Sequence, residues 1–211
     1  MKKQSLILMA SALGLLLGHA TPSNAAAVNV TLDTSSISGG AYTLVFDLIN
    51  GDGVTNNSVS LGGFSFGGGT SAGSPTFIGG ASGTLASTVT LSDSSFYNEF
   101  SENFTAGSVL KFSLDALANF AGGTPDSFSM YLLDSGGTPL SSLDPLGADQ
   151  FLSLDLSPSS TILSYAGADP QNPLPSPVIT ANEVPEPRML LLLIAGLFGL
   201  GYLENRKLQK L

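Results

Sequence analysis

The chain has 211 residues, of which 43% are hydrophobic, with 25 glycines, no cysteine and one histidine. Its formal net charge is −9, and a negative surface repels nucleic acid, so nucleic acid is not an expected partner. The single histidine, His19, lies in the N-terminal 27 residues. With no cysteine either, the rest of the chain is excluded from Ser-His-Asp and Cys-His catalysis, thiolate nucleophiles and His- or Cys-ligated zinc.

The segment formed by residues 1–27 has the three parts of a secretory signal peptide. It begins with the positively charged MKK, continues with an apolar run over residues 6–17, and ends in the small residues of SNAAA. The apolar run is shorter than a membrane-spanning helix requires. We therefore expect the Sec machinery to export the chain and signal peptidase to cut it after Ala25 or Ala27.

From residue 28 to residue 165, apolar and polar residues alternate with a period of two, which is typical of strands that bury one face. In SVLKFSLDAL, for example, Leu110, Phe112 and Leu114 are expected to point inward. Turns rich in glycine, serine and aspartate separate the runs. The pattern predicts an all-β domain, an antiparallel β-sandwich of jelly-roll type with about eight to ten short strands. The clearest strands are VNVTLDT, AYTLVFDLIN, TVTLSD, SVLKFSLDAL, DSFSMYLLD, FLSLDLS and STILSYA.

Two stretches of this domain do not follow the simple alternation. SSFYNEFSENF, residues 94–104, spaces Phe96, Phe100 and Phe104 four apart, which suits a helical turn and a bent edge strand equally well. FGGGTSAGSP lacks the lysine and the strand-to-helix setting of a phosphate-binding loop. We expect this second stretch to be a flexible loop.

The C-terminal part begins with a Pro-rich segment, residues 166–183, which is expected to be an extended linker. Farther on, residues 189–203 contain no charged residue. We expect them to form a transmembrane helix of about 22 Å, which is short of a hydrocarbon core of about 30 Å but can just span it if Arg188, Arg206 and Lys207 snorkel. The basic tail of Arg206, Lys207 and Lys210 is expected to stay on the cytoplasmic side of the inner membrane.

Between the linker and the apolar segment stands Val184-Pro185-Glu186-Pro187, in which the two prolines keep the chain extended. Together with the N-terminal signal, the apolar helix and the basic tail, this motif resembles the PEP-CTERM sorting signal of Gram-negative bacteria over residues 184–211. The resemblance implies recognition by an exosortase, processing near the motif, and delivery of the domain to the cell surface or the medium. It also implies an association with exopolysaccharide and biofilm.

Two residues depart from the pattern of that family. Arg188 directly follows the motif, where a small or apolar residue is usual, and Glu204 interrupts the basic tail. The central domain resembles one subfamily of PEP-CTERM proteins for which no activity is established, and this second resemblance implies a secreted sandwich. It is carried by LDTS, TVTLSDSSFYNEF, SFSMYLLDSGGTPL and DPLGADQFLSLDL.

Calcium is the one cofactor that the composition of the domain leaves open. In DLINGDGVTNN the candidate ligands are Asp47, Asn50, Asp52 and Asn56, since Ca²⁺ prefers several carboxylate and amide oxygens. Their spacing does not match an EF-hand. A hairpin turn rich in Asn and Asp is the simpler interpretation.

The leading functional hypothesis is an exported, non-catalytic protein of the surface or extracellular matrix. Of the 16 acidic and 7 basic residues, 15 acidic ones and the single Lys111 lie between residues 28 and 187, a charge of 1 − 15 = −14. Such a domain would hold an acidic polysaccharide only through Ca²⁺ bridges, or bind a neutral polymer instead.

Two alternatives assign a ligand or an activity to the sandwich. The first is a carbohydrate-binding module, which would stack sugars on aromatic rings. The second is a glycoside hydrolase, which needs two carboxylates facing one cleft. The aromatic candidates for the first alternative are Tyr42, Tyr97, Tyr131 and Tyr165.

Overall fold

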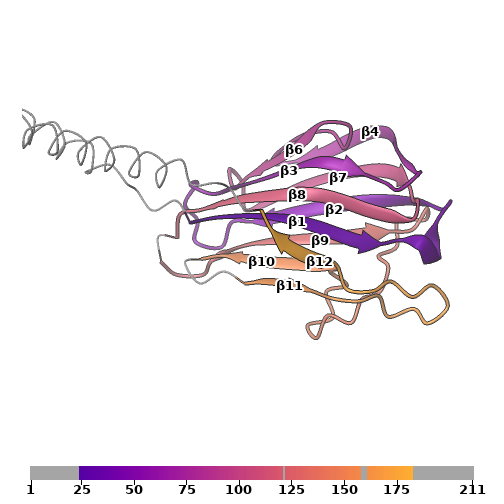
Figure 1. Cartoon of the computed structure of the whole chain (residues 1–211). Coiled ribbons are helices and arrows are strands. Elements are labelled where there is room, and N and C mark those ends of the chain that lie inside the picture. Colours follow the sequence, from indigo (N-terminus) through magenta and orange to yellow (C-terminus); the bar gives the residue numbers. More distant parts are fainter. Residues whose placement is uncertain (1–23, 121, 158–160, 183–211) are drawn as a thin grey trace, which may run out of the picture. The chain divides into compact units, whose positions relative to one another are not determined.

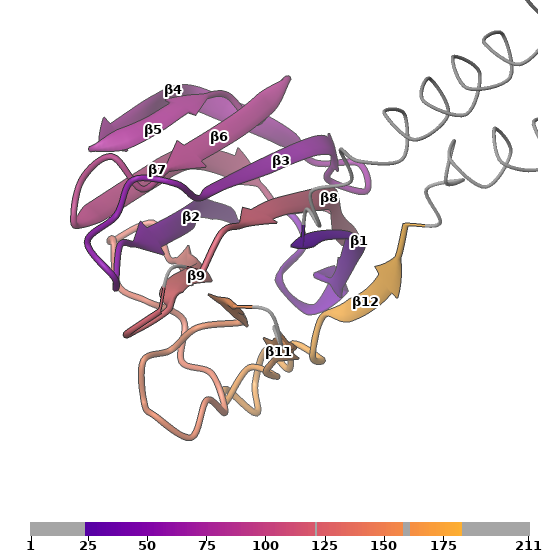
Figure 2. The ribbon, with the colours of Figure 1, turned by 90° about the vertical axis from the view of Figure 1, so that its left-hand side faces the viewer.

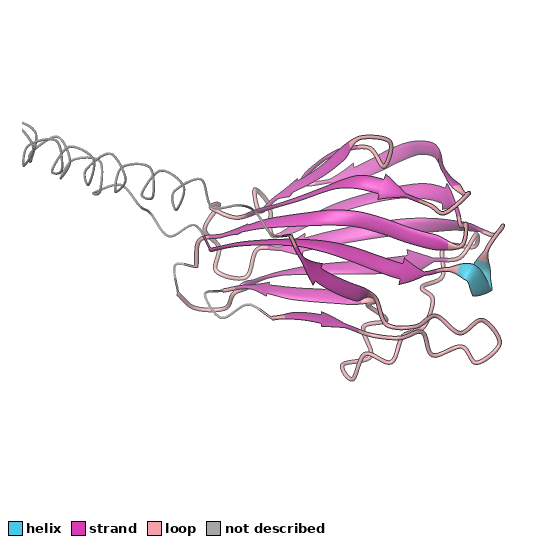
Figure 3. Cartoon of the chain, in the orientation of Figure 1, coloured by secondary structure: helices cyan, strands magenta, loops and turns pink. Residues whose placement is uncertain are grey.

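The computed structural model describes residues 24–120, 122–157 and 161–182. Over these ranges the chain folds into two antiparallel sheets of six strands each (Figure 1). Figure 3 shows one short helix among the described elements, the 3₁₀ turn η1 (Ser35–Ile37). The predicted all-β sandwich is therefore confirmed. The expected C-terminal helix and the apolar run of the signal lie outside the described residues.

The two sheets draw their strands from distant parts of the chain, and Figure 2 shows them as two layers. The first sheet has the order β12-β1-β8-β3-β6-β5 and the second the order β11-β10-β9-β2-β7-β4. The first contains β12 (Val178–Ala181), β1 (Asn24–Asp33), β8 (Val109–Ala118), β3 (Ser58–Ser65), β6 (Thr88–Ser92) and β5 (Gly80–Gly83). The second contains β11 (Ile162–Ser164), β10 (Leu152–Leu156), β9 (Asp126–Leu133), β2 (Ala41–Ile49), β7 (Tyr97–Thr105) and β4 (Thr70–Ile78).

The period-two alternation decides which side chains form the core. On β8, Leu110, Phe112 and Leu114 are buried while Lys111 is exposed, as the sequence predicted. The same alternation buries one face of β6, β7 and β10. Each strand of this kind removes a row of apolar side chains from water, which is the main favourable contribution to folding.

A cluster of phenylalanine rings lies at the centre of the core. Phe46 of β2 is fully buried. Its ring centroid lies 5.5 Å from that of Phe112 and 6.2 Å from that of Phe64, both in the first sheet. Within the second sheet, the ring centroids of Phe100 and Phe128 lie 6.2 and 5.9 Å from that of Phe46. Rings from both sheets therefore meet at one side chain.

The stretch of residues 94–104, which the sequence left open between helix and strand, belongs mostly to β7. Phe100 and Phe104 point inward and are buried, whereas Phe96 precedes the strand and is 75% exposed. The prediction of a flexible loop for FGGGTSAGSP is wrong from Thr70 onward, because β4 begins there and pairs with β7. β4 is held by main-chain hydrogen bonds to β7, which depend little on the side chains of β4. The alternation of apolar and polar residues therefore does not reveal this strand in the sequence.

Residues assigned to the signal and to the linker also contribute to the sandwich. β1 begins at Asn24, and Ala26 pairs with Ala116 of β8. Beyond Tyr165, the Gly167 N–H donates to the carbonyl of Leu174 at 2.8 Å, and Leu174 is buried. With β12 beside β1, the end of the described Pro-rich segment forms an edge strand of the first sheet.

Replacing Phe46 by alanine should lower the free energy of unfolding by about 3–5 kcal/mol, because it leaves a cavity where the two sheets meet. Urea unfolding of the full chain measures this loss. Phe96→Ala removes the same ring from a side chain that is 75% exposed, and it should cost less than about 0.5 kcal/mol. Equal losses in the two variants would contradict the assignment of Phe46 to the centre of the core.

Candidate functional site

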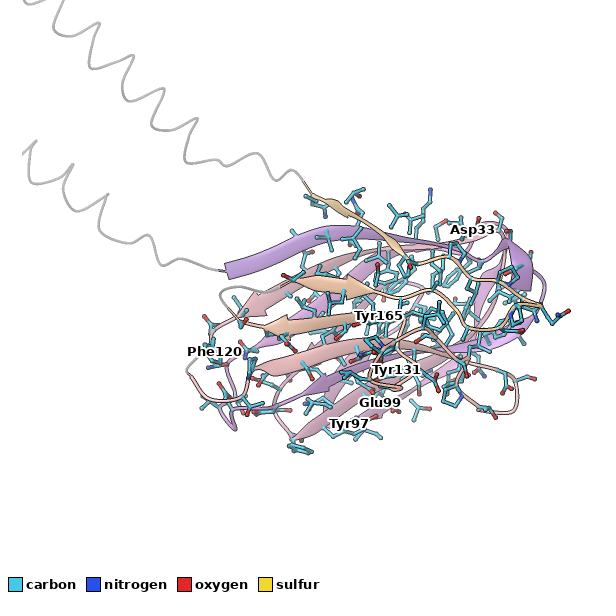
Figure 4. All side chains as sticks on the ribbon, turned by 90° about the horizontal axis from the view of Figure 1, so that it is seen from below. Asp33, Tyr97, Glu99, Phe120, Tyr131 and Tyr165 are labelled. Carbon is cyan, nitrogen blue, oxygen red and sulfur yellow. The ribbon has the colours of Figure 1, made fainter. Side chains whose placement is uncertain are left out.

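The outer face of the second sheet brings together three of the four candidate tyrosines. Figure 4 shows Tyr165, Tyr131, Glu99 and Tyr97 in a row across this face. We call it the tyrosine face and define it by Asp47, Tyr97, Glu99, Ser129, Tyr131 and Tyr165. The fourth candidate is not part of it.

Tyr42 lies on the inner side of the second sheet. Its ring centroid is 6.3 Å from that of Phe104, and the ring packs against the core. It also lines a small pocket with Leu140 and Leu174. Of the four tyrosines, Tyr42 therefore has a packing role.

Asp47 is at the centre of the tyrosine face because β2 is flanked by β7 and β9. In the register of the sheet it stands opposite Glu99 on β7 and opposite Ser129 on β9. Two carboxylates placed directly opposite each other repel. Asp47 is also only 8% exposed, so water does little to screen this repulsion.

The hydroxyl of Tyr97 lies between the two carboxyl groups. It is 2.6 Å from Glu99 Oε2 and 3.1 Å from Asp47 Oδ1. One hydroxyl proton cannot serve both acceptors, so a second proton is needed for both contacts to be hydrogen bonds. Burial, and then the charge of Glu99, raises the pKa of Asp47 to about 7 against the opposing effect of the Tyr97 hydrogen bond. When Asp47 is ionised the Tyr97 hydroxyl is the only donor between the two carboxylates, and when Asp47 is protonated it can donate to Tyr97 while Tyr97 donates to Glu99.

The tyrosines themselves stay protonated at neutral pH. Burial, and then the hydrogen bond to Glu99, raises the pKa of Tyr97 far above its usual range. Burial also raises the pKa of Tyr131 and of Tyr165, and nearby carboxylates add to the effect in both cases. Beside them the Ser129 hydroxyl donates to Gln150 Oε1 at 3.0 Å. The tyrosine face thus presents neutral rings next to hydrogen-bonding groups.

The arrangement of Asp47 and Glu99 does not form a hydrolytic cleft. Both oxygens contact the Tyr97 hydroxyl, so they are less than about 6 Å apart, close to the spacing of the carboxyl groups in retaining glycosidases. The hydroxyl, however, occupies the space between them where a glycosidic oxygen would have to lie. The geometry suits a structural network better than general acid–base catalysis.

Three of the four calcium candidates of the sequence, all except Asn56, use their side-chain oxygens on different partners. Asp47 binds Tyr97 on the tyrosine face, whereas Asn50 Oδ1 accepts the Gly53 N–H and Asp52 Oδ1 accepts the Val54 N–H. The last two contacts are typical of Asx turns. Within the described ranges no group of three or more His, Cys, Asp or Glu side chains is arranged for a metal ion.

A second polar cluster, which the sequence did not single out, lies at one end of the sandwich. Asp93 follows β6, Asp126 begins β9, and Asn57 precedes β3. All three are less than 5% exposed, at 0%, 1% and 4%. We call Asp93, Asp126, Asn56 and Asn57 the loop-end cluster. Its members come from three loops far apart in sequence, so spacing along the chain gave no signal.

The remaining site residues of the sequence analysis lie outside the described residues. They are the sorting motif Val184, Pro185, Glu186 and Pro187 and the basic tail Arg206, Lys207 and Lys210. In the part of the chain that the structure describes, no helix is long and apolar enough to span a membrane.

The comparisons with known proteins found no relative whose function could be assigned to this chain. No protein-family model matches the chain, and no curated protein or solved structure shows significant similarity to it. The functional argument therefore depends on the residues of this chain.

The raised pKa of Asp47 predicts a specific pH dependence of stability. Between its ordinary value of 3.8 and about 7, the folded state binds a proton that the unfolded chain has released. The free energy of unfolding should therefore fall as the pH rises through this window, by as much as about 4 kcal/mol. In Asp47→Asn this decrease should disappear, as measured by urea unfolding between pH 4 and pH 8.

The matched control for this prediction is Asp115→Asn, which makes the same charge change at an exposed position of β8. In that variant the free energy of unfolding should fall with rising pH as steeply as in the unchanged protein. A slope that is the same in Asp47→Asn and in the unchanged protein would contradict the proton assignment.

Proposed function

We propose that this protein is an exported, non-catalytic component of the cell surface or extracellular matrix of a Gram-negative bacterium, sorted and processed by an exosortase. The observation that carries the proposal is the order of segments along the chain. A signal-like start is followed by an acidic domain, then Val184-Pro185-Glu186-Pro187, an uncharged apolar segment and a basic end. Each of these segments has a role in export or sorting, and together they match one route.

The proposed route defines the partners. The Sec machinery and signal peptidase act on the N-terminal segment, and the chain is held in the inner membrane until the exosortase acts near Pro187. The domain then reaches the cell surface or the medium, where exopolysaccharide is the proposed neighbour. A chain without cysteine suits this path, because its folding requires no disulfide chemistry.

We also infer that the sandwich is a jelly roll. The first sheet contains the run β1-β8-β3-β6 and the second contains β2-β7-β4. Two interlocked Greek keys produce this alternation between sheets. The strands β9 to β12 then extend both sheets at one side.

The second candidate function is carbohydrate binding by the tyrosine face. The observation that favours it is that Tyr97, Tyr131 and Tyr165 share one surface with Ser129 and Glu99 (Figure 4). Partly exposed rings can stack on the apolar faces of sugars, and neighbouring polar groups can bind their hydroxyls. Given the acidity of the domain, a neutral polymer is the expected ligand.

The sorting proposal predicts that changing the motif stops processing. In the native host the unchanged protein should be recovered outside the inner membrane as a chain that ends near residue 187. The triple variant Pro185→Ala, Glu186→Ala, Pro187→Ala should stay in the inner membrane with its C-terminus intact. Cell fractionation followed by intact-mass measurement distinguishes the two forms.

The control is Pro175→Ala with Pro177→Ala, which removes two prolines just before the motif. This variant should be processed like the unchanged chain. Recovery of the unchanged protein at full length in the inner membrane would refute the sorting proposal.

Carbohydrate binding is tested with Tyr131→Ala and Tyr165→Ala on insoluble neutral polysaccharides and a glycan array. Each ring is expected to contribute about 1 kcal/mol, so each variant should bind about fivefold more weakly. Phe96→Ala, which removes an exposed ring that is not one of the residues of the tyrosine face, is the control. A response that is the same for all polymers, or unchanged in both tyrosine variants, would remove this candidate.

A further inference from the structure

The loop-end cluster places two buried carboxyl groups against each other. Burial, and then the nearby carboxyl of Asp126, raises the pKa of Asp93 above its ordinary value. Both carboxyl groups also bind Asn57, whose main-chain N–H donates to Asp93 Oδ2 at 2.8 Å and whose side-chain amide donates to Asp126 Oδ2 at 3.0 Å. Because Asp93 follows a strand of the first sheet and Asp126 begins a strand of the second, the cluster joins the two sheets.

Main-chain N–H groups around the cluster oppose this rise in the pKa of Asp93 but do not outweigh it. Asp93 Oδ2 also accepts the N–H of Asn56 at 2.9 Å, and Asp126 Oδ1 accepts the N–H of Gly51 at 2.8 Å. N–H groups aimed at a carboxylate stabilise its ionised form. These contacts hold both side chains in place, yet they supply no positive charge.

No basic side chain in the described part of the chain can compensate the two acids. The single basic residue there is Lys111, which is exposed near the start of β8. The cluster lies at the other end of that strand, where Asn119 donates to the carbonyl of Asn56. At about 3.3 Å per residue, the separation along β8 exceeds about 20 Å.

Two oxygen atoms in the cluster have no partner. Asp93 Oδ1 and Asn56 Oδ1 are enclosed, and neither takes part in a hydrogen bond within the described residues. Asp93 itself is 0% exposed. Enclosed acceptors without a donor are rare in folded proteins, and a bound ion is one of their established explanations.

We propose that the loop-end cluster binds a calcium ion, with Asp93 Oδ1, Asn56 Oδ1 and the carboxylate of Asp126 as ligands. Carboxylate and amide oxygens are what Ca²⁺ prefers, and about six to eight of them are needed. Main-chain carbonyls of the three loops and water would supply the others. The proposed site contains only two acidic side chains. It is therefore compatible with the finding that the described residues hold no group of three or more His, Cys, Asp or Glu side chains arranged for a metal ion.

The ion would have a structural role. It would connect the loop after β2, the loop after β6 and the start of β9, and so hold three loops and both sheets at one end. The sequence placed calcium at Asp47, Asn50, Asp52 and Asn56. The proposed site keeps Asn56 from that stretch, and its other ligands are two acids from other parts of the chain.

Calcium binding is tested on the purified full chain in mild detergent, freed of metal with a chelator and titrated calorimetrically with CaCl₂, with MgCl₂ in parallel. We expect one Ca²⁺ per chain with a dissociation constant at or below about 1 mM, the range of extracellular modules, and weaker binding of Mg²⁺. At a hundredfold excess over the dissociation constant, Ca²⁺ should raise the melting temperature by about 5–10 °C.

Asp93→Asn should weaken calcium binding at least tenfold, because it replaces a charged ligand and brings an amide N–H₂ into the site. Asp115→Asn, the same change at an exposed position of β8, should bind as the unchanged protein does. Asn56→Asp gives an independent measurement, since it adds a charged ligand. It should bind Ca²⁺ several-fold more tightly and be less stable than the unchanged chain in chelator.

Two results would overturn the proposal. One is the absence of heat and of any shift in melting temperature with CaCl₂ up to about 10 mM. If, in addition, the free energy of unfolding of Asp93→Asn at pH 8 is at least that of the unchanged protein, the two acids share a proton instead of a calcium ion. The other is an Asn56→Asp variant that folds but binds no Ca²⁺, which decides the question even if Asp93→Asn fails to fold.

Discussion

The contact between Phe46 and the rings of the opposite sheet is the interaction on which the rest of the structure depends. Phe46 stands on β2, the strand between β7 and β9, and it meets Phe112 and Phe64 across the interface. Packing at this point keeps the two sheets in one relative position. The tyrosine face and the loop-end cluster both depend on that position, since the first is the outer side of β2 and the second joins loops of both sheets.

Excess negative charge is the second constraint on this domain. With one lysine in the described ranges, its buried acids cannot be neutralised by ion pairs. On the tyrosine face the structure relieves the repulsion between Asp47 and Glu99 with a proton and the Tyr97 hydroxyl. In the loop-end cluster, burial and the neighbouring acid raise the pKa of Asp93 against the opposing effect of the N–H donors, and the compensation we propose is a cation. Burial, repulsion and hydrogen bonding thus lead to different solutions at two places in one molecule.

The segment after Tyr165 shows how composition can mislead. Its prolines favour an extended chain, and an extended chain can be a linker or can lie along a folded surface. Here Leu174 is buried and β12 joins the first sheet next to β1. Under the proposed function this has a consequence for sorting, because the domain would extend to within a few residues of Pro185. The exosortase would then have little free chain to act on.

The sequence by itself determined the class of fold and the inward faces of the well-patterned strands, because period-two alternation records which side of a strand avoids water. It also supports the export and sorting hypothesis, whose residues lie mostly outside the described structure. Only the tertiary structure decided that β4 and β12 are strands, because main-chain pairing leaves little trace in side chains. It also decided both sites. Asp47 meets Glu99, and Asp93 meets Asp126, only after strands from distant parts of the chain have paired, and no local pattern encodes which strands will become neighbours.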